Sequence, residues 1–141
     1  MKPRLILDTN VILDLLVFKD LSAEPIRLLL DAKMVDAVRS EASTLELIDV
    51  IQRPAFKLSR EEQEIILQAW ESNTRLLENE AIEPAPFTCR DLDDQVFINM
   101  AYSIRPALLL SKDLRVLELQ TIAKRHGIEI SQDYERVRHF S

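Results

Sequence analysis

The stretch that decides the fold is RLILDTN, residues 4–10, which is followed by the apolar residues 11–18. Residues 4–7 form a short apolar run that predicts a buried strand. Asp, Thr and Asn side chains commonly cap helices, so residues 8–10 predict the start of a helix. The run 11–18 is apolar almost all round apart from Asp14, which indicates that this helix is buried on most of its surface.

The same alternation of strand and helix continues along the chain. Further strands are predicted at residues 34–38, 81–85, 107–110 and 128–130, and helices at 22–32, 40–52, from 59 past 70, from 91 to before Pro106, and at 114–125. The strands are short apolar runs without period-2 alternation, which is typical of a parallel sheet covered on both faces. We expect an α/β fold with about five parallel strands, in a single domain over residues 1–141 whose tail from 132 is loose.

Two of these helices carry clear start signals. Ser40 is predicted to cap the helix at 40–52, with Leu45, Ile48 and Ile51 on its apolar side. Ser59 is predicted to cap the longest helix, because Glu62 stands three residues later in the position that completes a capping box.

Composition excludes several classes of protein. The 141 residues are 47% hydrophobic and 30% charged, as expected for one globular domain. A single glycine rules out a phosphate-binding P-loop, a dinucleotide-binding loop and a G-x-S-x-G nucleophile elbow. The lone Cys89 allows no internal disulfide, and no apolar run reaches the roughly 18 residues that a membrane span needs. We therefore expect a cytoplasmic protein without a membrane anchor.

The charge balance argues against a simple nucleic-acid-binding protein without excluding one. The net charge is −6, whereas such proteins are usually basic. Residues 60–83 hold seven glutamates against Arg60 and Arg75, a balance of −5, so the rest of the chain sums to −1. Acids that surround bound cations would leave the remaining surface basic overall.

Carboxylates are predicted to gather at one edge of the sheet. Parallel α/β sheets place their sites beyond the carboxyl ends of the strands, where the following helices begin. Four separate chain segments bring acids to this edge: Asp8, Glu46, the group Asp91, Asp93 and Asp94, and Asp113.

Each carboxylate also has a purely structural interpretation. Asp8, Asp91 and Asp113 can cap helices, and acids near a helix N-terminus are favoured by the helix dipole. Glu46 can be a solvated helix residue. Helix caps do not explain the convergence, because carboxylates held close together repel one another unless a cation is present. Mg²⁺ or Mn²⁺ suits such ligands, and a pair of these ions supports hydrolysis of phosphodiester bonds.

Four elements of the sequence resemble, in order, those of the PIN-domain nucleases. They are Leu5-Ile6-Leu7-Asp8-Thr9-Asn10, Ser40 with Glu46, Asp91-Leu92-Asp93-Asp94 followed by Phe97 and Ala101, and Ala107–Leu110 followed by Ser111-Lys112-Asp113. Arg53-Pro54-Ala55-Phe56 is similar to the bacterial subgroup described as toxin components of toxin–antitoxin systems.

The resemblance implies a PIN-like three-layer sandwich and Mg²⁺- or Mn²⁺-dependent cleavage of RNA. The metal ligands it implies are Asp8, Glu46, Asp91, Asp94 and Asp113, of which all but Asp91 are also the catalytic residues. Asn10 and Ser111 would orient these ligands from outside the first coordination sphere. It also implies an antitoxin protein as partner and a homodimer. Basic residues that flank the acids are candidate phosphate contacts: Arg53, Lys57, Lys112 and Arg115.

Two other functions remain open at this point. A binding or regulatory module on the same fold would bind RNA or protein without cutting it, and the net charge of −6 is its best support. A phosphoacceptor signalling domain also carries acids at strand ends. Its acid pair is expected after the first strand, whereas Asp93 and Asp94 come late in this chain.

Overall fold

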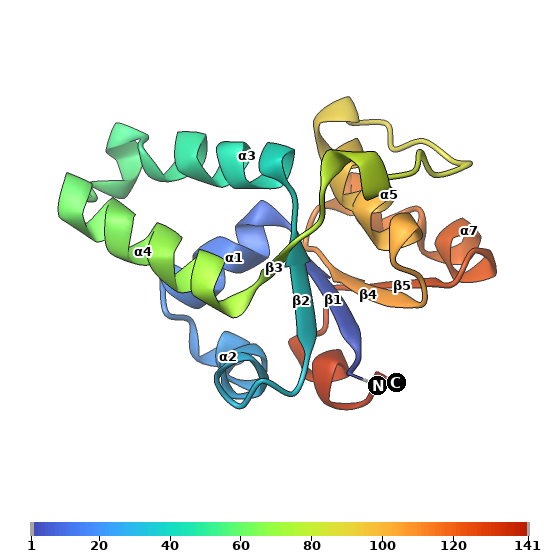
Figure 1. The fold of residues 1–141 in the computed structure, drawn as a ribbon, viewed down its shortest axis with the longest axis horizontal. Helices are drawn as coiled ribbons and strands as arrows, with labels where there is room; N and C mark the ends of the chain where they lie inside the picture. The colour runs from blue at the N-terminus through green and yellow to red at the C-terminus, as the bar shows by residue number, and fades with distance from the viewer. Residues whose placement is uncertain (1, 141) are drawn as a thin grey trace.

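A computed structural model describes residues 2–140; Met1 and Ser141, the two ends of the predicted domain, lie outside the described part. The strands are β1 (Arg4–Leu7), β2 (Asp36–Arg39), β3 (Arg75–Leu76), β4 (Ala107–Leu110) and β5 (Ile128–Ser131). The helices are α1 (Thr9–Leu16), α2 (Glu24–Asp31), α3 (Glu41–Ile51), α4 (Arg60–Asn73), α5 (Gln95–Ser103), α6 (Leu114–Leu117) and α7 (Gln120–Arg125). All strand pairs are parallel, in the order β3-β2-β1-β4-β5, which confirms the predicted α/β fold (Figure 1).

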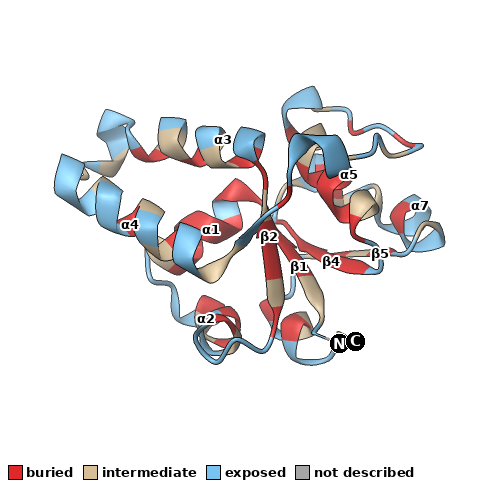
Figure 2. Ribbon diagram, in the orientation of Figure 1, coloured by how far each residue is buried: buried red, intermediate tan, exposed pale blue. Residues whose placement is uncertain are grey.

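The sheet separates two apolar cores. Leu5 and Leu7 of β1 pack with α1 to α4 on one face, and Ile6 packs with α5 to α7 on the other. β4 alternates in the same way, and all four of its residues are buried (Figure 2). A central strand that is buried on both faces explains why its sequence is continuously apolar.

The predicted caps are confirmed, and one predicted core residue is wrong. The hydroxyls of Ser40 and Ser59 accept hydrogen bonds from the third residue of α3 and α4, in capping boxes. Leu45, however, is 58% exposed, and the core contacts of α3 are made by Leu47 and Ile51. These two residues lie four apart and share one face of the helix, while Leu45 lies off that face.

Three predicted segments differ from the structure. No strand forms over 81–85. Ala81 ends a short 3₁₀ helix, and Pro84 and Pro86 lie in the irregular segment that follows it. The strand at this edge is β3, a two-residue element. The helix predicted over 114–125 is divided into α6 and α7. The tail predicted to be loose contains a 3₁₀ helix, η5 (Tyr134–Arg138), because Tyr134 and Val137 fill the core beside α2.

The shortage of glycine has a visible consequence in the backbone. Lys19, Lys33 and Lys57 adopt left-handed conformations with φ of 49°, 57° and 53°, which in most proteins favour glycine. Each of these lysines closely follows a helical segment, so the turns after these segments are formed without glycine.

Candidate metal centre

The carboxyl ends of the two central strands place Asp8 beside the loop that carries Asp113. The Asp8 amide donates to the Leu110 carbonyl at 3.0 Å, which extends the β1–β4 pairing by one step. Ser111 then joins the two acids, because its hydroxyl donates to Asp8 Oδ2 at 2.6 Å and accepts from the Asp113 amide at 3.1 Å. Ser111 and Asp8 are both buried, so this contact is fixed within the protein.

A second chain segment brings two more carboxylates to the same place. The 3₁₀ helix η4 (Leu92–Asp94) begins after Asp91 and leads directly into α5. Carboxylate oxygens of Asp91, Asp94 and Asp113 all lie within 4.8 Å of one another. We call these three residues the aspartate trio. Asp91 and Asp113 each also accept a hydrogen bond from a backbone amide of the following turn, so part of the predicted capping role is real.

Glu46 reaches the edge from α3. It is half-buried, and its Oε2 accepts a hydrogen bond of 2.6 Å from the Thr9 hydroxyl at the start of α1. Thr9 therefore fixes Glu46 beside Asp8, the residue that precedes it in the chain. This role of Thr9 is not among the predictions from sequence, although the residue stands in the middle of the Asp-Thr-Asn stretch.

Burial and mutual repulsion raise the pKa values of three of the acids, Asp94, Asp8 and Glu46. Burial, together with the charges of Asp8, Asp113 and Asp91 and the contact with the Asp113 carboxyl group, raises the pKa of Asp94 to about 7. Burial also raises the pKa of Asp8, against the opposing effect of the Ser111 hydrogen bond. Burial, with smaller contributions from Asp8 and Asp93, raises the pKa of Glu46 although Thr9 acts in the opposite direction.

The donor set fits a hard divalent cation. Asp94 is buried, and its Oδ2 is a buried oxygen that finds no hydrogen-bond partner within residues 2–140, which is costly in a folded protein. Asp8 occupies the cap position of α1 without a side-chain capping bond. Carboxylate oxygens are the ligands that Mg²⁺ and Mn²⁺ prefer, and such an ion would satisfy the orphaned oxygen and offset the repulsion.

The sequence comparison agrees with this architecture. The family model of the PIN domain matches residues 4–115, from the first residue of β1 to the loop and helix start after β4. The chain belongs to the PIN domain family. PIN domains are generally nucleases and typically use divalent metal ions, so the carboxylate edge of this PIN domain lies where nuclease chemistry is expected. No curated protein sequence matches the chain.

The structure places most of the predicted ligands of this PIN domain together. Asp91, Asp94 and Asp113 form the trio, Asp8 is linked to it through Ser111, and Glu46 is linked to Asp8 through Thr9. Asn10 is different: it is exposed on the first turn of α1, and the contact with Glu46 comes from its neighbour Thr9.

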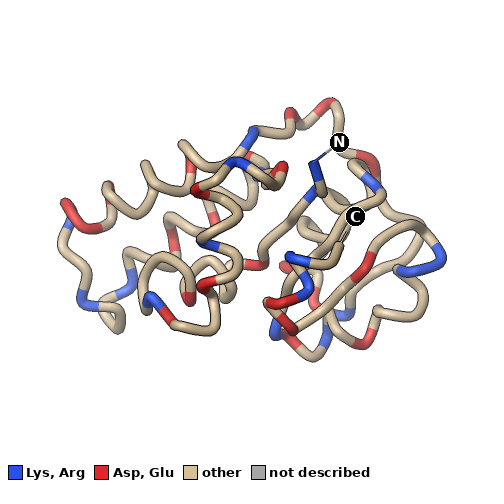
Figure 3. Tube along the Cα trace, turned by 90° about the horizontal axis from the view of Figure 1, so that it is seen from below, with Lys and Arg blue, Asp and Glu red and all other residues tan. Residues whose placement is uncertain are grey.

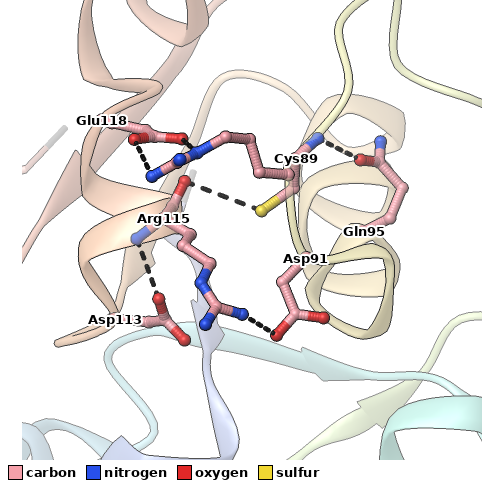
Figure 4. Close-up of polar contacts among 7 residues, drawn as sticks. Cys89, Asp91, Gln95, Asp113, Arg115 and Glu118 are labelled. Atoms are coloured by element: carbon pink, nitrogen blue, oxygen red, sulfur yellow. Dashed lines mark hydrogen bonds and ion pairs between the residues drawn. The ribbon is translucent and has the colours of Figure 1, made fainter.

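The predicted phosphate contacts are mostly engaged in ion pairs. Lys112 binds Asp14 at 2.5 Å, Arg115 binds Asp91 at 2.8 Å and Arg53 binds Asp49 at 3.1 Å, while Lys57 is exposed. Figure 4 shows Arg115 against two of the acids: its amide donates to Asp113 and its guanidinium to Asp91. Over the described residues, basic and acidic positions are interspersed along the trace rather than gathered on separate faces (Figure 3).

Within residues 2–140, the helices are too short or too polar to pass through a lipid bilayer.

Proposed function

We propose that this PIN domain is an endoribonuclease that hydrolyses RNA phosphodiester bonds at a Mg²⁺ or Mn²⁺ centre. The observation that carries the proposal is the buried Asp94 Oδ2, which has no hydrogen-bond partner and belongs to three carboxylates whose oxygens lie within 4.8 Å. The choice of RNA follows the resemblance of the four acidic elements to PIN-domain nucleases. A cytoplasmic location accords with Cys89 being a free thiol.

In this proposal the residues have distinct tasks. Asp94 and Asp113 would hold the ion, with Asp91, Asp8 and Glu46 as further ligands. Ser111 holds Asp8 and the Asp113 loop at a fixed spacing. A bound divalent ion would activate a water molecule and stabilise the leaving oxygen of the cleaved bond.

A catalytically silent RNA- or protein-binding module is the second candidate function. It is favoured by the net charge of −6 and by the ion pair between Arg115 and Asp91, which places a protein cation beside the proposed metal ligands. Such a module would bind RNA with unchanged affinity after addition or removal of Mn²⁺.

A toxin role would require a protein partner, and one surface supports it. A groove of about 470 Å³ between α1, α2 and α4 is lined by apolar residues, including Leu15, Leu16, Ile65 and Ala69, and by the charged residues Lys19, Asp20, Glu24 and Arg27. Exposed apolar grooves commonly accept protein segments. We propose an antitoxin segment as its occupant. A homodimer, with a second copy of the chain in the groove, is the other outcome, and the mass of the protein in solution tests it.

Calorimetric titration with Mn²⁺ tests the metal centre without knowledge of the RNA target. We expect the wild-type protein to bind Mn²⁺ and Asp8→Asn to bind it at least about 10-fold more weakly, since residues around metal sites contribute about that much. Cleavage of a mixed RNA pool should then require Mn²⁺ or Mg²⁺ and should be lost in the same variant. Wild-type protein that binds no Mn²⁺ at millimolar concentration would refute the proposal.

Replacing Arg115 tests the cation beside the trio. We expect Arg115→Gln to increase Mn²⁺ affinity by at least about fivefold, because a unit charge about 4 Å from another is worth roughly 1 kcal/mol even in water. RNA binding should weaken in the same variant if Arg115 contacts phosphate. Arg90→Gln is the matched control, because Arg90 pairs with Glu118 instead. An unchanged Mn²⁺ affinity in Arg115→Gln would show that this cation does not oppose metal binding.

A further inference from the structure

Asp14 is a buried carboxylate that lies outside the proposed metal ligands. It stands on α1, and only 6% of the residue is exposed. Its Oδ2 accepts two hydrogen bonds, from Lys112 Nζ at 2.5 Å and from the Tyr134 hydroxyl at 2.6 Å. A carboxylate in the apolar layer between α1 and η5 is costly unless its hydrogen bonds are satisfied, so this arrangement needs both partners.

The three residues Asp14, Lys112 and Tyr134, which we call the Asp14 triad, join parts of the chain that are distant in sequence. Asp14 belongs to α1, Lys112 to the loop between β4 and α6, and Tyr134 to η5. Tyr134 is itself buried, and its pKa is raised by burial first and by the contact with Asp14, so its hydroxyl stays a neutral donor.

Each of the three side chains of the loop 111–113 lies against a carboxylate of another segment. Ser111 donates to Asp8, Lys112 donates to Asp14, and Asp113 lies in the aspartate trio. Asp8 and Asp14 therefore fix the two residues that precede Asp113. Ser111 is bound to the cap residue of α1, and Lys112 is bound to α1 itself. These contacts restrict the direction in which the Asp113 side chain enters the site.

We propose that Asp14 is a positioning residue of the metal centre, which holds Asp113 in place through Lys112 and is itself held by Tyr134. The inference rests on the proposed function, because it assigns a role in the same site. It changes the role of Lys112 from a phosphate contact to a support of the ligand loop. It also gives the segment after residue 115, beyond the family match, a part in forming the centre.

Hydrogen exchange in the metal-free protein tests the positioning role independently of metal binding. We expect Asp14→Asn to accelerate exchange of the backbone amides of residues 112–114 by about 10-fold, while amides of β1 and β5 keep their protection. Should Asp14→Asn fail to fold, Tyr134→Phe decides, with an expected acceleration of a few-fold. Unchanged exchange at these amides in a folded variant would overturn the proposal.

Mn²⁺ titration tests the link to the centre. Asp14→Asn and Tyr134→Phe should each weaken Mn²⁺ binding, by about 10-fold and by a few-fold, as is usual for residues that orient metal ligands. Glu129→Gln is the matched control: it removes the ion pair between Glu129 and Arg136, which also fastens η5 but does not reach the loop. If Glu129→Gln weakens Mn²⁺ binding as much as Tyr134→Phe, η5 acts through general stability and the proposal fails.

Lys112→Met separates the two roles of the lysine. A positioning role predicts weaker Mn²⁺ binding and a lower kcat, with little change in KM for RNA. A phosphate contact predicts the reverse, namely a higher KM with unchanged Mn²⁺ affinity, and this result would overturn the assignment of Lys112. If wild-type protein binds no Mn²⁺, the proposed function fails while the exchange measurement still decides whether Asp14 holds the loop.

Discussion

Replacing Asp94 with asparagine is expected to eliminate Mn²⁺-dependent cleavage, with a loss of at least about 100-fold. Residues that only orient metal ligands are worth about 10- to 100-fold, and Asp94 is assigned as a direct ligand. The variant keeps the shape of the side chain but removes its charge. The measurement is single-turnover cleavage of RNA together with Mn²⁺ affinity by calorimetry.

The same variant should fold at least as well as the wild type when no metal is present. The wild-type carboxylate is buried, has a partnerless oxygen and has a pKa raised to about 7, so its ionised form destabilises the fold. Asp93→Asn is the matched control, because Asp93 is the exposed neighbour on η4. If folded Asp94→Asn protein still cleaved RNA at the wild-type rate, Asp94 would not be a ligand of the proposed metal centre.

The stability of the metal-free protein should fall as pH rises from about 4 to about 7. A carboxyl group whose pKa is raised in the folded state stabilises the fold while it is protonated, and that contribution is lost as it ionises. Asp94, with a pKa of about 7 against an ordinary 3.8, sets this interval, and Asp8 and Glu46 act in the same direction. Asp94 alone should lower the free energy of unfolding by up to about 1.4 kcal/mol for each pH unit.

Urea unfolding at several pH values, with and without Mn²⁺, measures this effect. Saturating Mn²⁺ should reverse the trend, because the ion binds the ionised carboxylates of the native state only. Asp94→Asn should flatten the metal-free curve. The prediction fails if the stability of the metal-free wild-type protein rises steadily from pH 4 to 7. That result would show that other groups already balance the charges of these acids.

The general architecture could be predicted from the sequence because local signals agree with it. The run at 4–7, the apolar residues 107–110 and the helix caps at Ser40 and Ser59 each specify an element without help from distant residues. The third strand could not be predicted in this way. β3 is two residues long, and it is defined by pairing with β2, including the bond from the Leu77 amide to the Arg39 carbonyl. Nothing in the residues 75–76 themselves indicates a strand.

In the candidate site, too, some features could be predicted from the sequence and others could not. Asp8 and Asp113 could be placed because Asp8 directly follows one predicted strand and Asp113 comes shortly after another, with Ser111 and Lys112 between. The order of the strands brings the two strand ends together. Two contacts could not be predicted from the sequence: the hydrogen bond from Thr9 to Glu46 and those of the Asp14 triad. They depend on how α1 packs against α3 and η5. In the sequence Asp14 is only an interruption of an apolar run, and Tyr134 falls in a polar tail.

The position of β4 beside β1, at the middle of the sheet, also bears on when the carboxylate edge forms during synthesis. The segments that carry the carboxylates are spread from Asp8 to Asp113, and the last contact of the Asp14 triad comes from Tyr134. A nascent chain on the ribosome has no neighbour for the second side of β1 until residues 107–110 have emerged. The carboxylate edge therefore assembles only after β4 has emerged, and products truncated before β4 lack Asp113.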